Sequence, residues 1–512
     1  MKQNLLHTSI VVSFVTILSR ILGFLREVTL AANFGAGVMS DAFVIALTAP
    51  SVVLVIFTGA ITAVYIPQYT STDGDRNHFT SNLITMLFII GFLFAVFFSI
   101  FPQTLVYLFA ANISPETFSL AIQLLRIMIW SAIPALLLGI FRGFLQIKQM
   151  FFVAMTSDAI INVFIIASIL SGKVTGNKLL LGFGTVIGNV VSILFLAFIS
   201  AQNGLSYRPR LELNDPHIKE MLLLMLPLMI SSAVLEVNQI VDKNLASSLI
   251  SGTVSSLNYA AKINNIITAL VGTSVGIALF PKMSELAAES DFASLKKYLI
   301  ENIKTLFPLL LPLTVGMALM AEPATRLLLE RGAFNPDDTT RTADCLQMYS
   351  LGLLAANLTQ LVTRVFYAMR QVKWPAILSA IALLVGIVLS LLLIGPLEHR
   401  GLALSASISS TLSVVLLLTL LRKKIGALGL RSHLKEFGKV TLASTVMGVP
   451  VWVAMQYCPI LTGTYVQCLI WTILIAGGGM LLYGAMLFIL RAEIISKIYN
   501  LQKKDGTQKN YV

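Results

Sequence analysis

The chain has 512 residues, of which 56% are hydrophobic and 12% are charged, and its formal net charge is +12. A soluble globular protein has roughly twice that charged fraction, so an ordinary soluble domain is excluded. Apolar runs of about twenty residues, long enough to cross a hydrocarbon core of roughly 30 Å, recur along the whole chain, whereas the alternating strands of a β-barrel are absent. We therefore predict an all-α polytopic membrane protein.

The apolar segments predict about fourteen transmembrane helices. We expect the first of them to be a retained helix and not a cleaved signal peptide, because Lys2 is followed by an apolar run with no small-residue cleavage site after a short core. In chain order the predicted spans are 8–33, 41–68, 80–110, 118–141, 151–172, 177–201, 219–249, 256–281, 303–325, 341–369, 374–396, 400–421, 437–457 and 467–490.

Lysine and arginine are concentrated in alternate loops, which predicts the orientation of the chain. One set of loops contains pairs such as Arg142 with Lys148 and Arg370 with Lys373, and the basic tail 491–512 lies on the same side. By the positive-inside rule this set is cytoplasmic, so both termini are inside, as an even number of spans requires. Topology accounts for the net positive charge, and nucleic acid is not an expected partner.

Two pairs of similar segments indicate a parallel internal repeat. "YIPQYTS" from residue 65 resembles "LFPKMSE" from residue 279, and "FRGFLQIKQ" from residue 141 resembles "FYAMRQVKW" from residue 366. Duplicated halves with a site between them are the usual architecture of alternating-access transporters. The predicted parts are a six-helix N-terminal lobe (1–201), a cytoplasmic linker (202–218), a six-helix C-terminal lobe (219–421), two additional helices (422–490) and the cytoplasmic tail (491–512).

Charged residues inside the first two spans are the strongest candidates for a site. A charge at the bilayer centre costs about 2.5–3.5 kcal/mol on insertion scales, so it persists where it faces a cavity or a partner. Arg20, Gly23 and Glu27 share one helical face, Arg26 borders it, and Asp41 begins the second span. One interpretation is a basic cavity for an anionic head group, since arginine donates two hydrogen bonds to phosphate. The other is structural pairing, such as Arg20 with Glu27 or Arg26 with Asp41.

The second half contains comparable intramembrane charges. Glu236 and Asp242 fall on one broad polar face of the seventh span, and Lys262 lies in the eighth. Arg126 and Arg364, in the fourth and tenth spans, are equally compatible with a site and with snorkelling to a span end.

No cofactor, metal or catalytic residue is predicted. The chain contains no G-x-x-x-x-G-K-[ST] loop for ATP, and its five histidines are scattered near span ends. Transport would be driven by the membrane potential, an ion gradient or the substrate's own gradient, with Asp41, Glu236 and Asp242 as candidate ion-coupling carboxylates and Glu27 as a further coupling or gating candidate. Cys458 and Cys468 flank one loop and could pair, although unpaired cysteines are the favoured interpretation.

Several motifs resemble the MurJ/MviN family of lipid II flippases, within the superfamily of multidrug, oligosaccharidyl-lipid and polysaccharide exporters. They are Ser19-Arg20, "GFLRE" from Gly23, "FGAG" from Phe34, Asp41-Ala42-Phe43, "SGTVSSLNYAAKI" from Ser251, "LLLERGAFNPDDT" from Leu327 and "VFYAMRQVKWP" from Val365. The resemblance covers nearly the whole chain. Two departures are visible: the second span has no arginine after Pro50, and Ala261-Lys262 stands where the family has Asp-Arg.

The resemblance implies a flippase of the bacterial cytoplasmic membrane that moves an undecaprenyl-pyrophosphate-linked glycan precursor, foremost lipid II, to the outer leaflet for peptidoglycan synthesis. Arg20, Arg26 and Asp41 would bind the pyrophosphate, with Gly23 and Lys262 beside them, while membrane lipids and the cell-wall synthesis machinery would be partners. The alternatives are a flippase for another undecaprenyl-linked exopolysaccharide unit, a drug/cation antiporter of the same superfamily, and a non-transporting scaffold for cell-wall synthesis.

Overall fold

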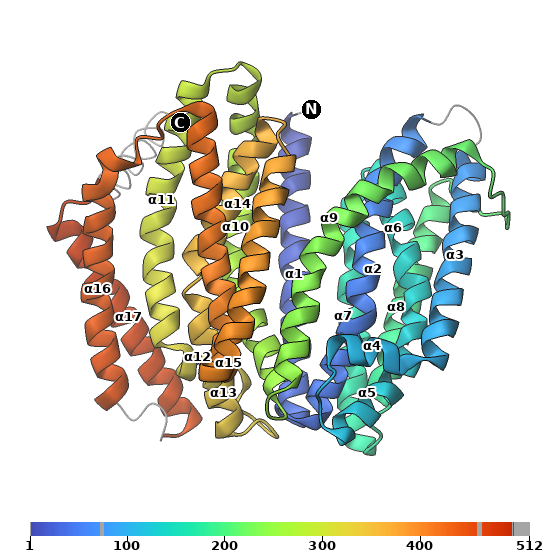
Figure 1. The fold of residues 1–512 in the computed structure, drawn as a ribbon, viewed down its shortest axis with the longest axis horizontal. Coiled ribbons are helices and arrows are strands. Elements are labelled where there is room, and N and C mark those ends of the chain that lie inside the picture. The colour runs from blue at the N-terminus through green and yellow to red at the C-terminus, as the bar shows by residue number, and fades with distance from the viewer. Residues whose placement is uncertain (1, 72–75, 458–462, 494, 496–512) are drawn as a thin grey trace, which may run out of the picture. The chain divides into compact units, whose positions relative to one another are not determined.

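The computed structural model describes residues 2–71, 76–457, 463–493 and 495, and the regular structure in these residues is helical (Figure 1). The chain forms two compact units. The first comprises Met1–Asn258 with Glu330–Asp338, and the second comprises Tyr259–Leu329 with Thr339–Val512.

The first unit is built around a group of long helices that run alongside one another (Figure 1). Its helices are α1 (Lys2–Phe34), α2 (Val38–Ser71), α3 (Arg76–Ile100), α4 (Pro102–Phe109), α5 (Pro115–Met128), η1 (Ile129–Ser131), α6 (Ala132–Ile147), α7 (Phe151–Thr175), α8 (Leu180–Gln202), α9 (Pro216–Ser247) and the first six residues of α10 (Thr253–Ala288). The loop 330–335 and the first three residues of α13 complete it.

The second unit contains the rest of α10 and the C-terminal helices. These are α11 (Phe292–Leu319), α12 (Ala321–Leu329), the remainder of α13 (Pro336–Ser350), α14 (Leu353–Ala368), α15 (Lys373–Ile425), η2 (Leu430–His433), α16 (Leu434–Tyr457) and α17 (Tyr465–Ile489). Within it α11 packs on α14 and α16, α14 packs on α15, and α16 packs on α17.

α15 is a hairpin of two helices, although its helical backbone is almost continuous over 53 residues. At 1.5 Å per residue a straight helix of that length would measure about 80 Å, far more than a bilayer. Glu398 has φ +49°, and the hydroxyls of Ser390 and Ser405 lie 2.6 Å apart. Fifteen residues of continuous helix would separate them by about 22 Å, so the chain reverses between them. The reversal falls between the predicted spans 374–396 and 400–421.

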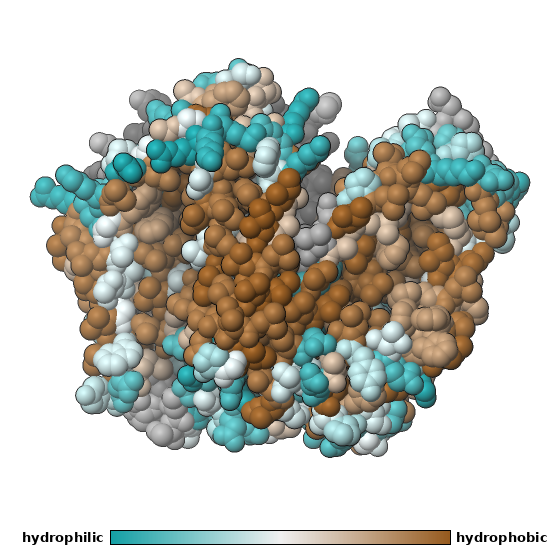
Figure 2. Space-filling model, in the orientation of Figure 1, coloured by the Kyte–Doolittle hydropathy of each residue, from teal (hydrophilic) through white to brown (hydrophobic). Residues whose placement is uncertain are grey.

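Helices lie at each of the fourteen predicted spans, and in the described part of the chain nine helical stretches are long and apolar enough to cross a membrane. Figure 2 shows apolar surface over the middle of the helices of each unit and polar surface at their ends. Large apolar side chains such as Leu194, Phe198 and Leu392 are more than 60% exposed, as side chains that face lipid should be. The all-α membrane fold predicted from composition is confirmed.

α2 is the central helix of the first unit, where it packs against α5, α6 and α9. Its buried Tyr65 stacks on Phe79 of α3 with ring centroids 6.1 Å apart, and its hydroxyl hydrogen-bonds with that of Thr80 at 3.0 Å. α9, which begins the C-terminal lobe predicted at 219–421, packs on α2 and α4 in the first unit. The lobe boundaries inferred from the repeat stay a prediction.

Candidate functional site

A polar seam lies along the contact between α1 and α7. The guanidinium of Arg26 donates through Nη1 to Oδ1 of Asn162 at 3.2 Å and through Nη2 to Oε1 of Glu27 at 2.6 Å. The other oxygen of Glu27 accepts from Nδ2 of Asn258 at 3.1 Å, in the first turns of α10. Glu27 is 3% exposed, so this pair is withdrawn from water and links three helices.

Two further features of the seam are a polar atom of Arg26 without a partner and the absence of a side chain at Gly23. Nε of Arg26 is buried and makes no hydrogen bond with the described residues. A Cβ at Gly23 would lie 3.8 Å from Nδ2 of Asn162, so the absence of a side chain at position 23 leaves the amide of Asn162 close to the surface of α1. The helix that approaches α1 at Gly23 is α7.

Arg20 lies in a polar pocket on the same seam, about 390 Å³ in volume. The pocket is lined by Ser19, Arg20, Arg142, Gln146, Ala154, Met155 and Asp158, which come from α1, α6 and α7. Arg20 is exposed, and its side chain makes no hydrogen bond or ion pair with another described residue.

The second arginine of the pocket, Arg142, is held by α7. Its Nη2 donates to Oδ1 of Asp158 at 2.5 Å, and both Nε and Nη2 donate to Oγ of Ser157, at 3.0 and 2.5 Å. Asp158 and Asn162 are one helical turn apart on α7, so the same face of α7 serves Arg142 and Arg26.

Asp41 has a structural role in this arrangement. Its Oδ2 accepts from the backbone N–H of Gly252 at 2.6 Å, and its Oδ1 accepts from that of Ser255 at 2.7 Å. These amides are among those left without intrahelical partners at the start of α10, where the helix dipole favours a negative charge. Asp41 is 3% exposed and caps α10 from another helix.

The predicted coupling carboxylates of α9 are bound to neighbouring amides. Glu236 accepts from Gln239 at 2.6 Å, and Asp242 accepts from Asn238 at 2.9 Å. Both carboxylates are partly buried in the first unit. Lys262 lies on the part of α10 that belongs to the second unit, where it is also partly buried.

The remaining candidates are distributed over both units. Arg126 is exposed on α5 of the first unit, and Arg364 is partly buried on α14 of the second. No group of His, Cys, Asp and Glu that could hold a metal ion occurs in the described ranges. Cys458 and the tail from residue 496 lie outside the described residues, so the prediction for Cys458 and Cys468 stays open.

Sequence reasoning missed Asp158 and Asn162, and it assigned Arg142 to a loop as a marker of topology. A signal was present, because Asp158 lies well inside the predicted span 151–172 and Asn162 follows it by four residues. An aspartate in such a span is a candidate partner for an intramembrane arginine.

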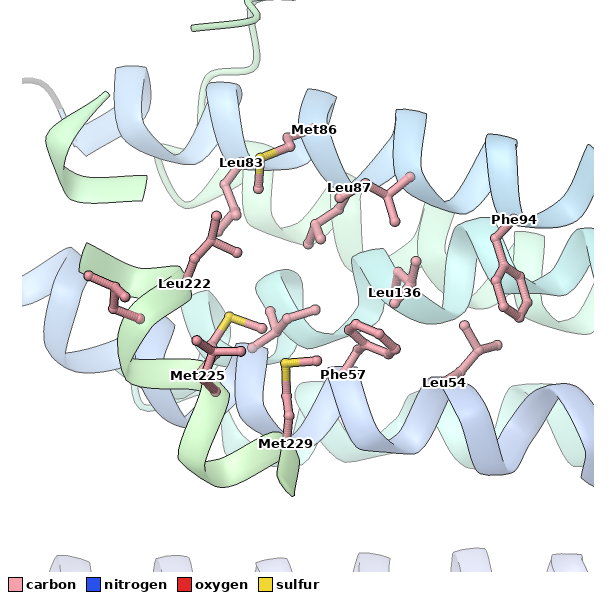
Figure 3. A pocket seen from close by; sticks show the side chains of 14 residues that line it. Leu54, Phe57, Leu83, Met86, Leu87, Phe94, Leu136, Leu222, Met225 and Met229 are labelled. Carbon is pink, nitrogen blue, oxygen red and sulfur yellow. The ribbon is translucent and has the colours of Figure 1, made fainter. Parts of the chain in front are cut away.

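A second pocket of the first unit, about 270 Å³ in volume, is entirely apolar (Figure 3). It lies among α2, α3, α6 and α9, and Figure 3 shows Phe57, Leu87 and Met229 pointing into it. An engineered cavity of about 150 Å³ with similar lining stays dry and binds benzene, so this pocket is suited to hydrocarbon and contributes no charge to the polar seam.

Comparison with known proteins gives the family. The family profile described as "Lipid II flippase MurJ" matches residues 30–471. The chain belongs to this family. A protein of Rickettsia prowazekii named "Probable lipid II flippase MurJ" is 29% identical over 464 residues, which cover 89% of this chain and 91% of the relative. One of Burkholderia cenocepacia named "Lipid II flippase MurJ" is 26% identical over 470 residues, covering 89% and 91%.

Solved structures agree with this assignment. "Lipid II flippase MurJ, inward closed conformation" has a TM-score of 0.80 and 27% identity, covering 95% of this chain and 100% of that one. A multidrug resistance MATE family transporter in an inward-facing conformation has a TM-score of 0.68 and 14% identity, covering 80% and 95%, which shows a shared fold. The predicted family is confirmed, and the protein is a multi-pass protein of the bacterial cytoplasmic membrane.

Proposed function

We propose that this protein moves lipid II, an undecaprenyl-pyrophosphate-linked precursor of peptidoglycan, from the inner to the outer leaflet of the cytoplasmic membrane by alternating access. The observation that carries the proposal is the family match over residues 30–471, together with relatives named lipid II flippases. A flippase moves its substrate without chemical change, so no catalytic residue is required.

The polar seam of α1 supplies groups suited to the pyrophosphate. Arg20 has a guanidinium with no partner among the described residues, and Arg26 has a buried Nε with none. Planar guanidinium groups bind phosphate oxygens through two parallel hydrogen bonds. Of the predicted site residues, Arg20 and Arg26 are thus proposed as ligands, whereas Asp41 and Glu27 are proposed to hold the helices that carry them.

The proposal also includes the orientation of the chain in the membrane and the driving force for transport. Both termini would be cytoplasmic by the distribution of lysine and arginine, and no ATP would be used by this chain. The membrane potential is worth about 2.3 kcal/mol per charge per 100 mV and would act on the cationic site, or an ion would bind at Glu236 or Asp242. Enzymes of cell-wall synthesis would receive the product on the outer face.

Complementation of a bacterial strain depleted of its own lipid II flippase tests the function. We expect the wild-type chain to restore growth and to restore the exposure of lipid II at the outer leaflet, measured by its accessibility to an externally added degrading enzyme. Arg20→Ala is expected to abolish both at an unchanged protein level, because it removes the free guanidinium of the seam. Growth without any outer-leaflet lipid II would contradict the proposal.

One rival is favoured by a specific observation. The second span lacks the arginine expected after Pro50, and lysine stands at position 262. A less arginine-rich site would suit a different undecaprenyl-linked glycan. Failure to complement, combined with loss of a secreted polysaccharide when the chain is deleted from its own host, would favour that function. A non-transporting scaffold predicts that Arg20→Ala has no effect.

A further inference from the structure

The pocket that contains Arg20 has a second cationic group that nothing in the family assignment requires. Arg142 comes from the last two turns of α6 and lines the same 390 Å³ pocket, a volume in the range of small-ligand pockets. Its side chain is 29% exposed, so the guanidinium is within reach of a ligand.

The contacts of Arg142 fix its position and leave donors over. Nε and Nη2 are used by Ser157 and Asp158 on α7, while Nη1 makes no hydrogen bond with any described residue. A guanidinium has five N–H donors in a rigid fork, so two remain available on Nη1. The guanidinium of Arg142 is thus fixed to α7 through Nε and Nη2, while Nη1 can donate to a ligand.

The rest of the lining is rich in unused donors. The hydroxyl of Ser19 is buried without a hydrogen-bond partner, and the side chains of Arg20 and Gln146 make no hydrogen bond with the described residues. Asp158 is the single carboxylate in the lining, and it is already bonded to Arg142. Two positive charges against one negative charge, with several free N–H and O–H groups, favour an anion.

We propose that Arg20 and Arg142 form a binding site for one phosphate or pyrophosphate group, and that Ser157 and Asp158 are positioning residues that hold Arg142 for it. The proposal rests on the proposed function in that the group would belong to the lipid-linked substrate. The alternative is that Arg142 and Asp158 merely fasten α6 to α7.

The two interpretations differ in the sign of one effect. If the ion pair only fastens helices, removal of either partner damages the same contact, and Arg142→Gln and Asp158→Asn should impair binding alike. If Arg142 binds the anion, Arg142→Gln weakens binding, whereas Asp158→Asn strengthens it, because a competing negative charge leaves the pocket. Asparagine keeps the shape of the side chain and an oxygen that accepts from Arg142.

The experiment is equilibrium dialysis of radiolabelled inorganic pyrophosphate against the purified full-length protein in detergent. We expect Arg142→Gln to weaken binding about tenfold, which is 1.4 kcal/mol. This is the lower end for a charge-assisted hydrogen bond and allows for the partial exposure of the side chain. Arg208→Gln, which alters an exposed arginine on the loop after α8, is the matched control and should bind as the wild type does.

Unchanged binding in Arg142→Gln, or weaker binding in Asp158→Asn, would overturn the proposal, as would a wild-type protein that binds no pyrophosphate. Where Arg142→Gln does not fold, Asp158→Asn alone decides by its direction. A competition arm distinguishes the source of the group: undecaprenyl pyrophosphate that displaces the label at lower concentration than free pyrophosphate indicates a lipid head group, and the reverse indicates a free anion. Phosphatidylglycerol should not displace the labelled pyrophosphate.

Failure of this site and failure of the proposed function give different results. If the wild-type chain complements the flippase-depleted strain but Arg142→Gln binds pyrophosphate normally, the proposed function is supported and the proposed site is refuted. If the chain does not complement the strain but Arg142→Gln weakens pyrophosphate binding, the proposed site is supported and the proposed function is refuted.

Discussion

Replacement of Asp41 should release the first turn of α10 rather than remove a substrate contact. The buried carboxylate accepts two backbone N–H bonds, from Gly252 at 2.6 Å and from Ser255 at 2.7 Å. Hydrogen bonds to charged groups contribute about 1.5–3 kcal/mol each, and the helix dipole adds about 0.3–1 kcal/mol. Asp41→Ala therefore costs about 3–7 kcal/mol locally, and Asp41→Asn, which keeps one acceptor, about half of that.

Hydrogen exchange followed by mass spectrometry measures this cost directly. A loss of about 3 kcal/mol corresponds to a fall of about a hundredfold in the protection of the amides in 252–258, at 1.4 kcal/mol per tenfold. Asp215→Ala is a matched control, because Asp215 caps α9 through the amide of His217 at 2.9 Å and accepts from Nδ2 of Asn82 on α3 at 3.3 Å, so its loss should leave the protection of 252–258 unchanged. Unchanged protection of 252–258 in Asp41→Ala would refute the capping role.

Three further outcomes are expected. Glu27→Ala should lower the stability of the protein in detergent by about 3–5 kcal/mol, because it leaves the mostly buried guanidinium of Arg26 without its ionic partner, and thermal unfolding monitors this. Gly184→Ala should destabilise the contact of α7 with α8 by at least about 1–3 kcal/mol, since a Cβ there would overlap the side chain of Ser168, and the yield of monodisperse protein reports it. Asp291 caps α11, and its hydrogen bonds with Ser294 hold the pKa of its carboxyl below the usual range. The cap is therefore present at neutral pH and is lost as the pH falls through that lowered pKa. Hydrogen exchange at the start of α11, corrected for intrinsic rates, measures this loss.

Each of these outcomes has a control within the chain. Gly37→Ala adds a Cβ that meets nothing within 4 Å, so a similar loss of yield there would contradict the steric explanation for Gly184. Replacing Arg26 and Glu27 together by apolar residues should cost less than Glu27→Ala alone, because no unpaired charge stays buried. Asp291→Asn should remove the pH dependence at α11; if the dependence persists, another group titrates.

The spans were predictable from the sequence because membrane hydropathy is a local property of about twenty residues. The reversal of α15 was predictable for the same reason, since polar Glu398, His399 and Arg400 interrupt two apolar runs. Arg20 and Arg26 stood out as candidates because a charge in an apolar span is costly and therefore informative.

The partners of those charges were not predictable from the sequence. Helix contacts in lipid depend on close packing and specific hydrogen bonds, and hydropathy does not say which helix lies against α1. The proposed pairs Arg20 with Glu27 and Arg26 with Asp41 gave way to Arg26 with Glu27 and Asn162, while Asp41 bonds to the start of α10. Adjacent residues on a helix seldom face each other, so helical spacing alone does not predict the Arg26–Glu27 pair.

The cap by Asp41 also determines what a comparison of many related sequences can detect. The bond to position 255 ends on a backbone N–H, which every residue except proline provides, so the side chain there is free to vary while position 41 is not. Methods that infer contacts from paired substitutions need both positions to change together. This contact would leave no such record, and an aspartate constrained by it would resemble one constrained by a ligand.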